Sequence, residues 1–412
     1  MSFTKASVRD ASLGGQRVLA RVDVNVPLEE GEVADDTRIR AALPTIELMR
    51  ERDAAVVLCS HLGRPQGRDP ELSLAPVATR LGELLSADVP LAPGVVGVDV
   101  ARAAEDLTPG GVLMLENTRF EPGETKNDPA LAEALAGLAN TYVDDAFAAA
   151  HRAHASTEGV AHHLPGYAGL LLEREVRELT AVRDDPEPAL VVLLGGAKVS
   201  DKIGAIERLM ESAEQILIGG AMAFSFFRAQ ELPTGDSLVE ADGVELARRA
   251  LDRAADSECE LRLPVDLVLG DRFDAGAERR EIDGVEVPDG WMGLDIGPRT
   301  ASGYGAAVSS AGTVFWNGPM GAFELDPFAA GTRSVAKSIA AAEGRTVVGG
   351  GDSAAALNEF GLADDVDWLS TGGGASIELM EGKALPGVEA LLDAEKARNP
   401  AKTDPKRSIS RE

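Results

Sequence analysis

Two lysines beside a glycine pair are the first residues whose types and spacing point to chemistry. An apolar run over Leu190–Leu194 has the length of a buried strand. Two glycines follow it, and Lys198 and Lys202 lie four residues apart around a helix predicted over Ser200–Ser212. Glycines let backbone N–H groups approach a ligand, and a helix N-terminus attracts anions. Because two ammonium groups strengthen that attraction, the stretch predicts a polyphosphate site. A tight turn with two solvated lysines fits the same pattern.

Four further glycine-rich segments in the second half of the chain each follow a predicted strand. They are Gly219-Gly220, Asn317-Gly318 with Glu324 nearby, Gly349 to Ser353, and Gly372 to Gly374. One such turn is weak evidence, because compact turns commonly use glycine. Five together predict a nucleotide site lined by backbone, in which N–H groups meet phosphate and the Asp352 carboxylate binds Mg²⁺. The sequence has neither a Walker A motif nor a strict GxGxxG, which removes the commonest ATPase and dehydrogenase fingerprints.

Polar side chains also follow the predicted strands of the first half. Asp23 and Asn25 end the first strand, and later segments supply Arg38, His61, Arg64, Arg119 and Arg152. The carboxyl ends of parallel strands are where α/β proteins bind ligands, so these residues together predict a basic bowl for a small, multiply charged anion. The alternatives are separate surface ion pairs and simple turn hydrogen bonds. His151 and His154 do not indicate zinc, because no cysteine or third histidine lies at ligand spacing.

The bulk composition narrows the function classes. The 412 residues carry a formal net charge of −28, and 44% of them are hydrophobic. This length predicts two or three domains. The acid excess argues against nucleic-acid or anionic-membrane binding, and with few lysines it suggests adaptation to concentrated salt. Cys59 and Cys259 form no disulfide framework, and no apolar run approaches the ~18 residues of a membrane span. We therefore expect a cytoplasmic protein.

Apolar, strand-like runs alternate with helical patterns along the chain. The predicted strands are Arg17–Val22, Ala55–Cys59, Gly111–Leu115, Thr141–Val143, Ala189–Leu194, Gln215–Ile218, Val265–Leu269, Thr313–Trp316, Thr346–Val348 and Trp368–Ser370. The other predicted helices include Thr37–Glu51, Ser73–Leu85, Pro129–Ala139, Gly243–Ala255 and Phe328–Ala342. Such βα units indicate parallel sheets covered on both faces. A helix predicted over Leu170–Arg183 separates two α/β domains, and residues 394–412 are expected to form a loosely held tail.

These motifs closely resemble the phosphoglycerate kinase family. The matching segments, in the family's order from Arg21 to Val388, are RVDVNVPL, DDTRIRAALPTI, SHLGRP, LENTRF, DAFAAAHRAHAS, LLGGAKVSDKI, GWMGLDIGP, VFWNGPMGAFE, GGGDSAAA, STGGGAS and EGKALPGV. The resemblance implies two Rossmann-like domains with parallel sheets, joined by a helix and separated by a cleft. It implies a 3-phosphoglycerate domain over residues 1–168, a connecting helix over 169–187 and a Mg-nucleotide domain over 188–385, with segment 386–412 returning to the first domain.

The resemblance also assigns roles to individual residues. It implies that 3-phosphoglycerate binds to Asp23, Asn25, Arg38, His61, Arg64, Arg119 and Arg152. It implies that the nucleotide binds to Lys202, Gly219, Gly220, Asn317, Glu324, Gly350, Gly351, Asp352 and Ser353, with Asp352 on Mg²⁺. Arg38 and Lys198 match the residues that handle the transferred phosphoryl group, with N–H groups at Gly350 and Gly373 assisting. The departures from the family pattern include Asp144 where Asn is usual, Ala148 where Gly is usual and Thr118 where Leu is usual.

The implied reaction is reversible phosphoryl transfer between 1,3-bisphosphoglycerate and MgADP, which gives 3-phosphoglycerate and MgATP. In the ATP-consuming direction the nucleophile is a carboxylate that is already ionised at neutral pH, so no general base is needed. Catalysis then comes from positioning and charge stabilisation. One competing class is a non-catalytic nucleotide- or anion-binding protein on the same fold, and another is a dehydrogenase, whose fingerprint is absent. A hinged enzyme of this kind needs no partner chain, so we expect a monomer.

Overall fold

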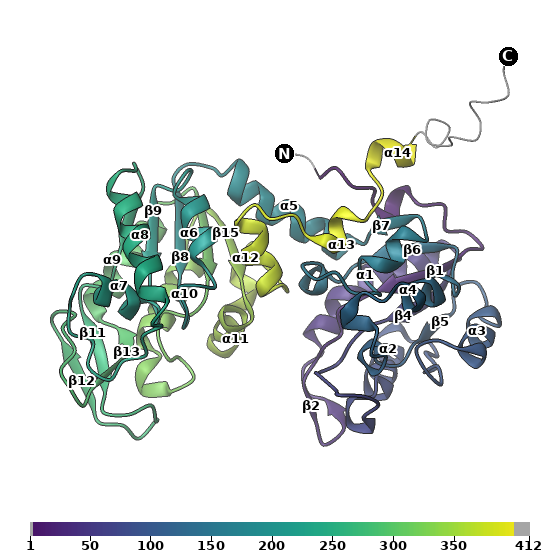
Figure 1. Ribbon diagram of the computed structural model, residues 1–412, viewed down its shortest axis with the longest axis horizontal. Coiled ribbons are helices and arrows are strands. Elements are labelled where there is room, and N and C mark those ends of the chain that lie inside the picture. Colours follow the sequence, from purple (N-terminus) through teal and green to yellow (C-terminus); the bar gives the residue numbers. More distant parts are fainter. Residues whose placement is uncertain (1–2, 399–412) are drawn as a thin grey trace, which may run out of the picture. The chain divides into compact units, whose positions relative to one another are not determined.

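The computed structural model describes residues 3–398, which fold into two compact units (Figure 1). The N-terminal unit contains residues 3–177 and 384–398, and the C-terminal unit contains residues 178–383. Helix α5 (Leu170–Asp184) runs from the first unit into the second. Each unit is built on a parallel sheet, so the prediction of an α/β fold with parallel sheets is confirmed. None of the helices in the described part of the chain combines the length and the apolar character that a bilayer crossing requires.

The N-terminal unit is organised around a five-stranded parallel sheet. Its strands, in spatial order, are β5 (Val112–Met114), β4 (Ala55–Cys59), β1 (Arg17–Arg21), β6 (Thr141–Asp144) and β7 (Gly166–Ala168). Strand β4 is buried at every residue, as expected for a central strand covered on both faces. In the register of the sheet, Arg21 lies opposite Cys59 on one side and Asp144 on the other. The segments that follow these strands therefore emerge from the same edge.

Helices and short strands complete this unit. The helices are α1 (Thr37–Glu51), α2 (Ala75–Leu85), α3 (Val98–Glu105), α4 (Pro129–Ala136), α13 (Pro386–Glu389) and α14 (Ala394–Arg398), and β2 (Leu28–Glu29) pairs with β3 (Glu32–Val33). Helix α4 begins where its sequence predicts, because the Asp128 carboxylate accepts from the Leu131 N–H at 3.0 Å and Pro129 has no N–H that would need an acceptor.

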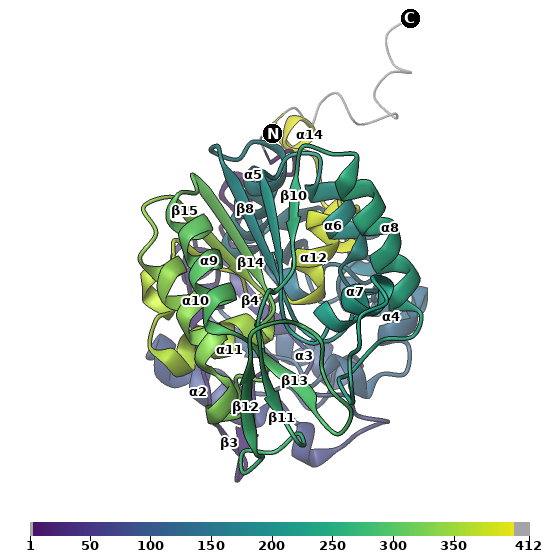
Figure 2. The same cartoon turned by 90° about the vertical axis from the view of Figure 1, so that its left-hand side faces the viewer.

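The C-terminal unit has a six-stranded parallel sheet with helices on both faces (Figure 2). Its strands, in spatial order, are β10 (Glu260–Arg262), β9 (Gln215–Ile218), β8 (Leu190–Leu194), β14 (Thr313–Asn317), β15 (Arg345–Gly349) and β16 (Trp368–Leu369). One face carries α6 (Ile203–Leu209), α7 (Ala223–Ala229), α8 (Gly243–Ala255) and α12 (Gly374–Met380). The other carries α9 (Pro298–Ser309), α10 (Ala330–Ala340) and α11 (Gly351–Phe360).

A small antiparallel sheet corrects one part of the sequence prediction. Its strands, in spatial order, are β12 (Arg279–Ile282), β11 (Leu267–Gly270) and β13 (Met292–Ile296). The pattern over Val265–Leu269 predicts a member of a parallel sheet, but the strand occupies residues 267–270 and pairs antiparallel with both neighbours. An apolar run signals burial without showing the direction of its partners, and the exposed, charged residues of β12 carry no apolar signal.

Two further expectations need correction. The helix predicted over Ser200–Ser212 covers only Ile203–Leu209, with Lys202 at its N-cap, so both lysines precede the helix instead of flanking its first turn. The tail predicted from residue 394 is helical over α14, because Ala394 donates to the Thr4 carbonyl at 2.8 Å and the neighbouring chain pairs with Lys5. The rest of the predicted tail, residues 399–412, lies outside the described residues.

Candidate binding sites at the two sheet edges

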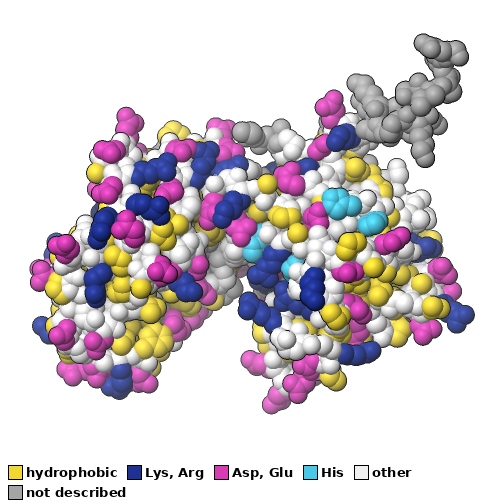
Figure 3. All heavy atoms as spheres, viewed as in Figure 1, with side chains coloured by type: hydrophobic (Ala, Val, Ile, Leu, Met, Phe, Trp, Pro, Cys, Tyr) yellow, Lys and Arg dark blue, Asp and Glu magenta, His cyan; other side chains and the backbone are white. Residues whose placement is uncertain are grey.

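Basic side chains gather at the carboxyl edge of the N-terminal sheet. We call Arg38, His61, Arg64, Arg119 and Arg152 the basic cluster. His61 and Arg64 follow β4, Arg119 follows β5, and Arg152 follows β6. Figure 3 shows Lys and Arg side chains concentrated beside histidines on one part of this unit, whereas Asp and Glu are scattered over the visible surface. The structure thus brings together the side chains that the sequence predicted as a basic bowl.

The charges of this cluster repel one another. Burial lowers the pKa of Arg119, and the charges of Arg152 and Arg21 lower it further. Burial also holds the pKa of His61 well below its usual value, and Arg21, Arg119, His154 and Arg38 act in the same direction. Within residues 3–398, Arg64 and Arg152 are exposed and form no ion pair. A bound anion would relieve this repulsion, which makes the edge a suitable anion site.

A set of hydrogen bonds ties the cluster to the strand ends. Arg38, in the first turn of α1, donates to the Asp23 carboxylate, which also accepts from the Asn25 N–H at 3.2 Å. The Asn25 side chain accepts from the Gly63 N–H at 2.9 Å, and Arg119 donates to the Gly63 carbonyl at 2.5 Å. Asp23 and Asn25 therefore position the loop and the helix that carry the basic groups.

No sequence motif singles out the residues behind the cluster. Arg21, the last residue of β1, is fully buried, and Glu124 and Ser156 beside it are buried as well. The one available signal is a charged residue near the end of a largely apolar strand, because a charge that is buried there has to be hydrogen-bonded. The sequence pattern does not show which groups bond to Arg21.

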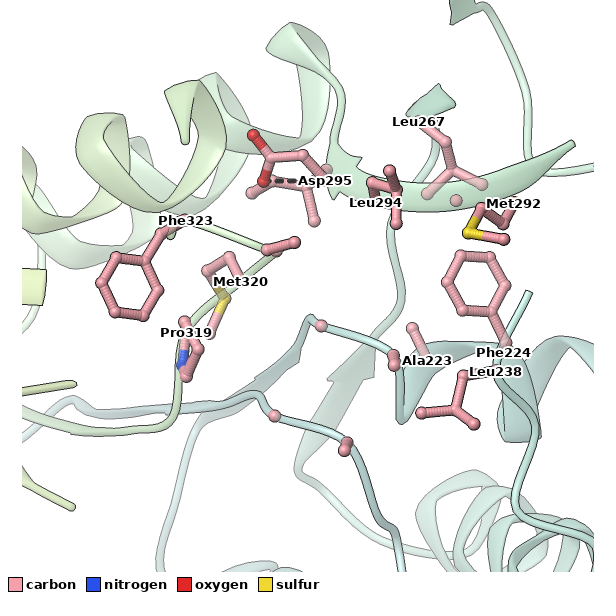
Figure 4. A pocket seen from close by; sticks show the side chains of 18 of the residues that line it. Ala223, Phe224, Leu238, Leu267, Met292, Leu294, Asp295, Pro319, Met320 and Phe323 are labelled. Carbon is pink, nitrogen blue, oxygen red and sulfur yellow. Dashed lines mark hydrogen bonds between the residues drawn. The ribbon is translucent and has the colours of Figure 1, made fainter. Parts of the chain in front are cut away.

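The C-terminal unit contains a mostly apolar pocket at the corresponding edge of its sheet. The pocket has a volume of ≈ 730 Å³. Phe224, Leu238 and Met292 lie on one side of it, and Pro319, Met320 and Phe323 lie on the other (Figure 4). Gly220, Glu324 and Asp352 from the predicted nucleotide set line the same pocket. Such an apolar cavity with a few polar groups is typical of a small-molecule site.

Glycines allow two strand ends to meet at the floor of this pocket. The Gly195 N–H donates to the Asn317 carbonyl, and the Gly196 N–H donates to the Pro319 carbonyl, each at 3.0 Å. A Cβ on Gly195 would lie 2.0 Å from the Pro319 oxygen, so no other residue fits there. Gly219 is similarly confined against Met320, and Gly220 has a positive φ of 66°. These positions require glycine for packing, whatever they bind.

Lys202 and Asn317 form the polar centre of the site. The Lys202 ammonium donates to both the backbone and the side-chain oxygen of Asn317, each at 2.7 Å. Burial lowers the pKa of Lys202 to about 7, although the nearby charge of Asp352 opposes the shift. The other end of the amide, Nδ2, is buried without a hydrogen-bond partner among the described residues. A Cβ on Gly350 would lie 3.0 Å from that nitrogen, so the free donor faces the start of α11.

Lys198 is exposed on the turn that connects β8 to α6. Glu240 holds this turn, because its carboxylate accepts from the Ser200 N–H at 3.0 Å and from the Ser200 hydroxyl. Burial opposes ionisation of Glu240, but the bonds from Ser200 and Val199 and the charge of Lys198 keep its pKa below the usual value. Glu240 has no sequence signal for this role, since no pattern links it to a turn 40 residues earlier.

The glycine-rich segments near residues 350 and 373 also meet at this edge. Helix α11 begins after Gly350, whose φ is 99°, and the Ser353 hydroxyl accepts from the Gly318 N–H at 2.6 Å. A Cβ on Gly373, the N-cap of α12, would lie 3.9 Å from the Gly351 nitrogen. Asp352 is exposed beside them, and no group of three or more potential metal ligands occurs among residues 3–398. One carboxylate that acts with substrate phosphates suits Mg²⁺, so the donor set fits that ion.

Comparisons with known proteins agree on one family. The model of the family described as "Phosphoglycerate kinase" matches residues 8–383. The curated phosphoglycerate kinase of Rubrobacter xylanophilus is 54% identical, over 95% of this chain and 99% of that protein. The one from Moorella thermoacetica is 53% identical, over 95% and 100%. The solved phosphoglycerate kinase of Coxiella burnetii, 39% identical, superposes with a TM-score of 0.84 over 94% of this chain and 98% of its own.

Proposed function

Because the chain belongs to the phosphoglycerate kinase family, we propose specific roles for the two sites in the reaction of that family. The protein is a phosphotransferase that transfers a phosphoryl group between phosphoglycerate and ADP or ATP. The roles of individual residues, the bound metal and the state of assembly form our proposal. The observation that supports it is the presence of a basic cluster, in which Arg64 and Arg152 are exposed, at one sheet edge and of an apolar pocket at the other.

The basic cluster binds 3-phosphoglycerate in this proposal. Arg64 and Arg152 make no ion pair within the described residues, so they keep their charges for the phosphate and carboxylate of the substrate. Arginine suits this task because its planar fork can donate two parallel hydrogen bonds to either group. Asp23 and Asn25 fix the loop and helix from which Arg38, His61 and Arg119 reach the ligand.

The C-terminal pocket binds the nucleotide. In this proposal its apolar walls enclose the base, and Glu324, which lines the same pocket, accepts hydrogen bonds from the ribose hydroxyls. The polar centre near Lys202, Asn317 and residues 350–353 contacts the phosphates, and Gly219 and Gly220 let the backbone approach the ligand. Asp352 would supply one carboxylate oxygen to the Mg²⁺ of the nucleotide substrate, which would provide positive charge beside the phosphates.

Catalysis rests on positioning and charge, since an ionised carboxylate needs no base. Arg38 and Lys198 neutralise the oxygens of the phosphoryl group during transfer, and N–H groups at Gly350 and Gly373 support them. The proposed acceptor site and the nucleotide pocket belong to different units, so each unit supplies one of the two substrates. The alternative is a binding protein without turnover, but binding alone would not require this full set of charge-stabilising groups.

We further propose a cytoplasmic monomer that binds neither nucleic acid nor membranes, since the net charge of −28 disfavours polyanionic partners. The same acid excess suggests that the protein functions in concentrated salt, where screening weakens its self-repulsion.

One assay tests both the function and the salt adaptation. ATP consumption by the purified protein is measured with and without 3-phosphoglycerate and Mg²⁺, in molar KCl and in dilute buffer. We expect turnover that requires both additions and that is faster in KCl. Folded protein that binds ATP but shows no turnover in either buffer would favour the binding-protein alternative. Equal activity and stability in both buffers would contradict the salt adaptation alone.

A further inference from the structure

We propose that Arg21 is a positioning residue that fixes His61 as a neutral ring with its proton on Nε2. His61 then presents an N–H donor to the bound phosphoglycerate and adds no charge to the basic cluster. This inference rests on the proposed substrate site, but its central claim concerns the protein without ligand. Arg21 itself does not reach the substrate in this scheme, because it is fully buried behind the cluster.

The contact between the two side chains determines the tautomer. The Arg21 Nη2 group lies 3.0 Å from Nδ1 of His61. A guanidinium carries only donors, so Nδ1 has to accept this hydrogen bond and cannot carry a proton. The proton of the neutral ring then lies on Nε2, the nitrogen that Arg21 leaves free.

Arg21 cannot turn away from this contact, because each part of its guanidinium is bonded. Its Nε donates to the Ser156 hydroxyl at 3.0 Å, and its Nη1 donates to the Val22 carbonyl at 2.5 Å and lies 3.3 Å from the Ser60 hydroxyl. The Glu124 carboxylate holds Ser156 in turn, through its hydroxyl at 2.6 Å and its N–H at 3.1 Å. A buried chain of bonds from Glu124 through Ser156 and Arg21 therefore ends on His61.

The surroundings of His61 disfavour a positive ring from every side. Arg21 faces it from β1, Arg38 from α1, Arg119 from the segment after β5 and His154 from the segment after β6. Protonating Nδ1 would place two donors against each other and add a cation among three guanidinium groups. Burial acts in the same direction on the pKa of the ring.

A neutral His61 changes the pH dependence expected for substrate binding. A cationic histidine would strengthen binding below its pKa and release the ligand above it. With His61 neutral throughout, the basic cluster itself keeps a constant charge near neutrality, because arginine does not titrate there. The cluster then contributes no pH dependence of its own to the KM for 3-phosphoglycerate, whereas the substrate phosphate ionises with a pKa of ~6.

Nitrogen-15 NMR of the free protein tests the tautomer directly. The chain has only five histidines, so selective labelling and one substitution, His61→Gln, assign the His61 signals. We expect a protonated Nε2 and an unprotonated Nδ1 at every pH from about 5 to 8, on both sides of the ordinary value of ~6.5. A ring that titrates in this range, or a proton on Nδ1, would overturn the proposal whether or not the substrate binds.

Variants of Arg21 test the origin of the effect. In Arg21→Met we expect the His61 ring to titrate or to populate both tautomers, because nothing then demands an acceptor at Nδ1. Arg21→Lys, whose ammonium also carries only donors, should retain more of the Nε2–H form. An unchanged His61 spectrum in a folded Arg21→Met protein would refute the role of Arg21.

A pair of His61 variants tests the use of the Nε2 proton without touching Arg21. In His61→Gln the side-chain amide can place an N–H donor near the position of Nε2, whereas the amide of His61→Asn is too short to reach that position. We expect the KM for 3-phosphoglycerate to rise about tenfold more in His61→Asn than in His61→Gln, with kcat changing less than KM. Equal effects would contradict the donor role of His61. A normal spectrum with no binding of 3-phosphoglycerate by the wild type would instead refute the proposed substrate site.

Discussion

The two sheet edges differ in the groups that line their candidate binding sites. At the N-terminal edge the proposed substrate site consists of basic side chains, and Arg64 and Arg152 have no ion-pair partner within residues 3–398. At the C-terminal edge the walls are apolar side chains and closely packed glycines, and the Lys202 ammonium already donates to Asn317. A small anion with several charges offers little apolar surface, so only charge can hold it. A nucleotide also offers a base, so shape contributes there.

We expect the largest effect from a substitution that removes a charge at the N-terminal edge. Arg38→Ala should lower kcat by ~10³ or more, because an arginine that neutralises phosphoryl oxygens contributes on that scale. Steady-state kinetics and calorimetric ATP binding should show a loss of turnover with nearly unchanged nucleotide affinity. Arg40→Ala is the matched control, since Arg40 lies in the same helix, is exposed and pairs with Asp36. Similar turnover in both variants would contradict the proposed role of Arg38 in phosphoryl transfer.

The next largest effect is steric and confined to the C-terminal edge. Gly195→Ala places a Cβ 2.0 Å from the Pro319 oxygen, which forces the ends of β8 and β14 apart. We expect a destabilisation of roughly 2–4 kcal/mol and weaker ATP binding, with 3-phosphoglycerate binding retained. Calorimetric unfolding and binding titrations measure both. Gly67→Ala serves as the control, because a Cβ there meets nothing within 4 Å. Loss of both ligands to the same extent would show that the two edges are not independent.

The smallest effect concerns a buried acid beneath the N-terminal edge. Asp144 is fully buried, and its Oδ2 has no hydrogen-bond partner among the described residues. Burial raises its pKa from 3.8 to about 7, against the opposing effects of the Ala146 N–H and Arg21. The folded state therefore binds a proton that the unfolded state releases between these values. Stability is lost as the pH rises from about 4 to about 7 and stays lost above that range.

Asp144→Asn removes this loss, because an amide does not titrate. We expect the free energy of unfolding of the variant to exceed that of the wild type by about 1–3 kcal/mol above pH 7. The difference should be smallest below pH 4. Thermal unfolding at several pH values measures the difference. Asp128→Asn is a suitable control, since it substitutes a solvent-accessible helix cap that already has its hydrogen bond. An advantage that is constant with pH would mean that Asp144 does not titrate on unfolding.

The sequence revealed those features that repeat locally and missed those that depend on distant partners. The bounds of α1, α8, β4 and β9 match the predicted ranges, because each has a continuous periodic or apolar signal of its own. The gathering of Arg38, His61, Arg119 and Arg152 was also predictable, since strand ends in a parallel sheet share one edge. Their assigned contacts with ligands stay predictions.

Other features had no local signal. The antiparallel partners of β11 have no continuous apolar pattern, and nothing near Ser200 points to the Glu240 side chain that holds it. The network from Glu124 to His61 joins four segments, and each of its residues fits a strand, a loop or a turn when considered alone. Such features arise from the folded arrangement, so only the structure could show them.

The return of residues 384–398 to the N-terminal unit affects the order in which the protein matures during synthesis. The Leu392 N–H donates to the carbonyl of Gly166, the first residue of β7, and Lys5 pairs with Asp393. The N-terminal unit is therefore completed only after residues 178–383 have been synthesised. Those residues form a contiguous unit that can finish folding earlier. During the synthesis of residues 178–383, which are about half of the polypeptide, the N-terminal unit therefore lacks its contacts with residues 384–398.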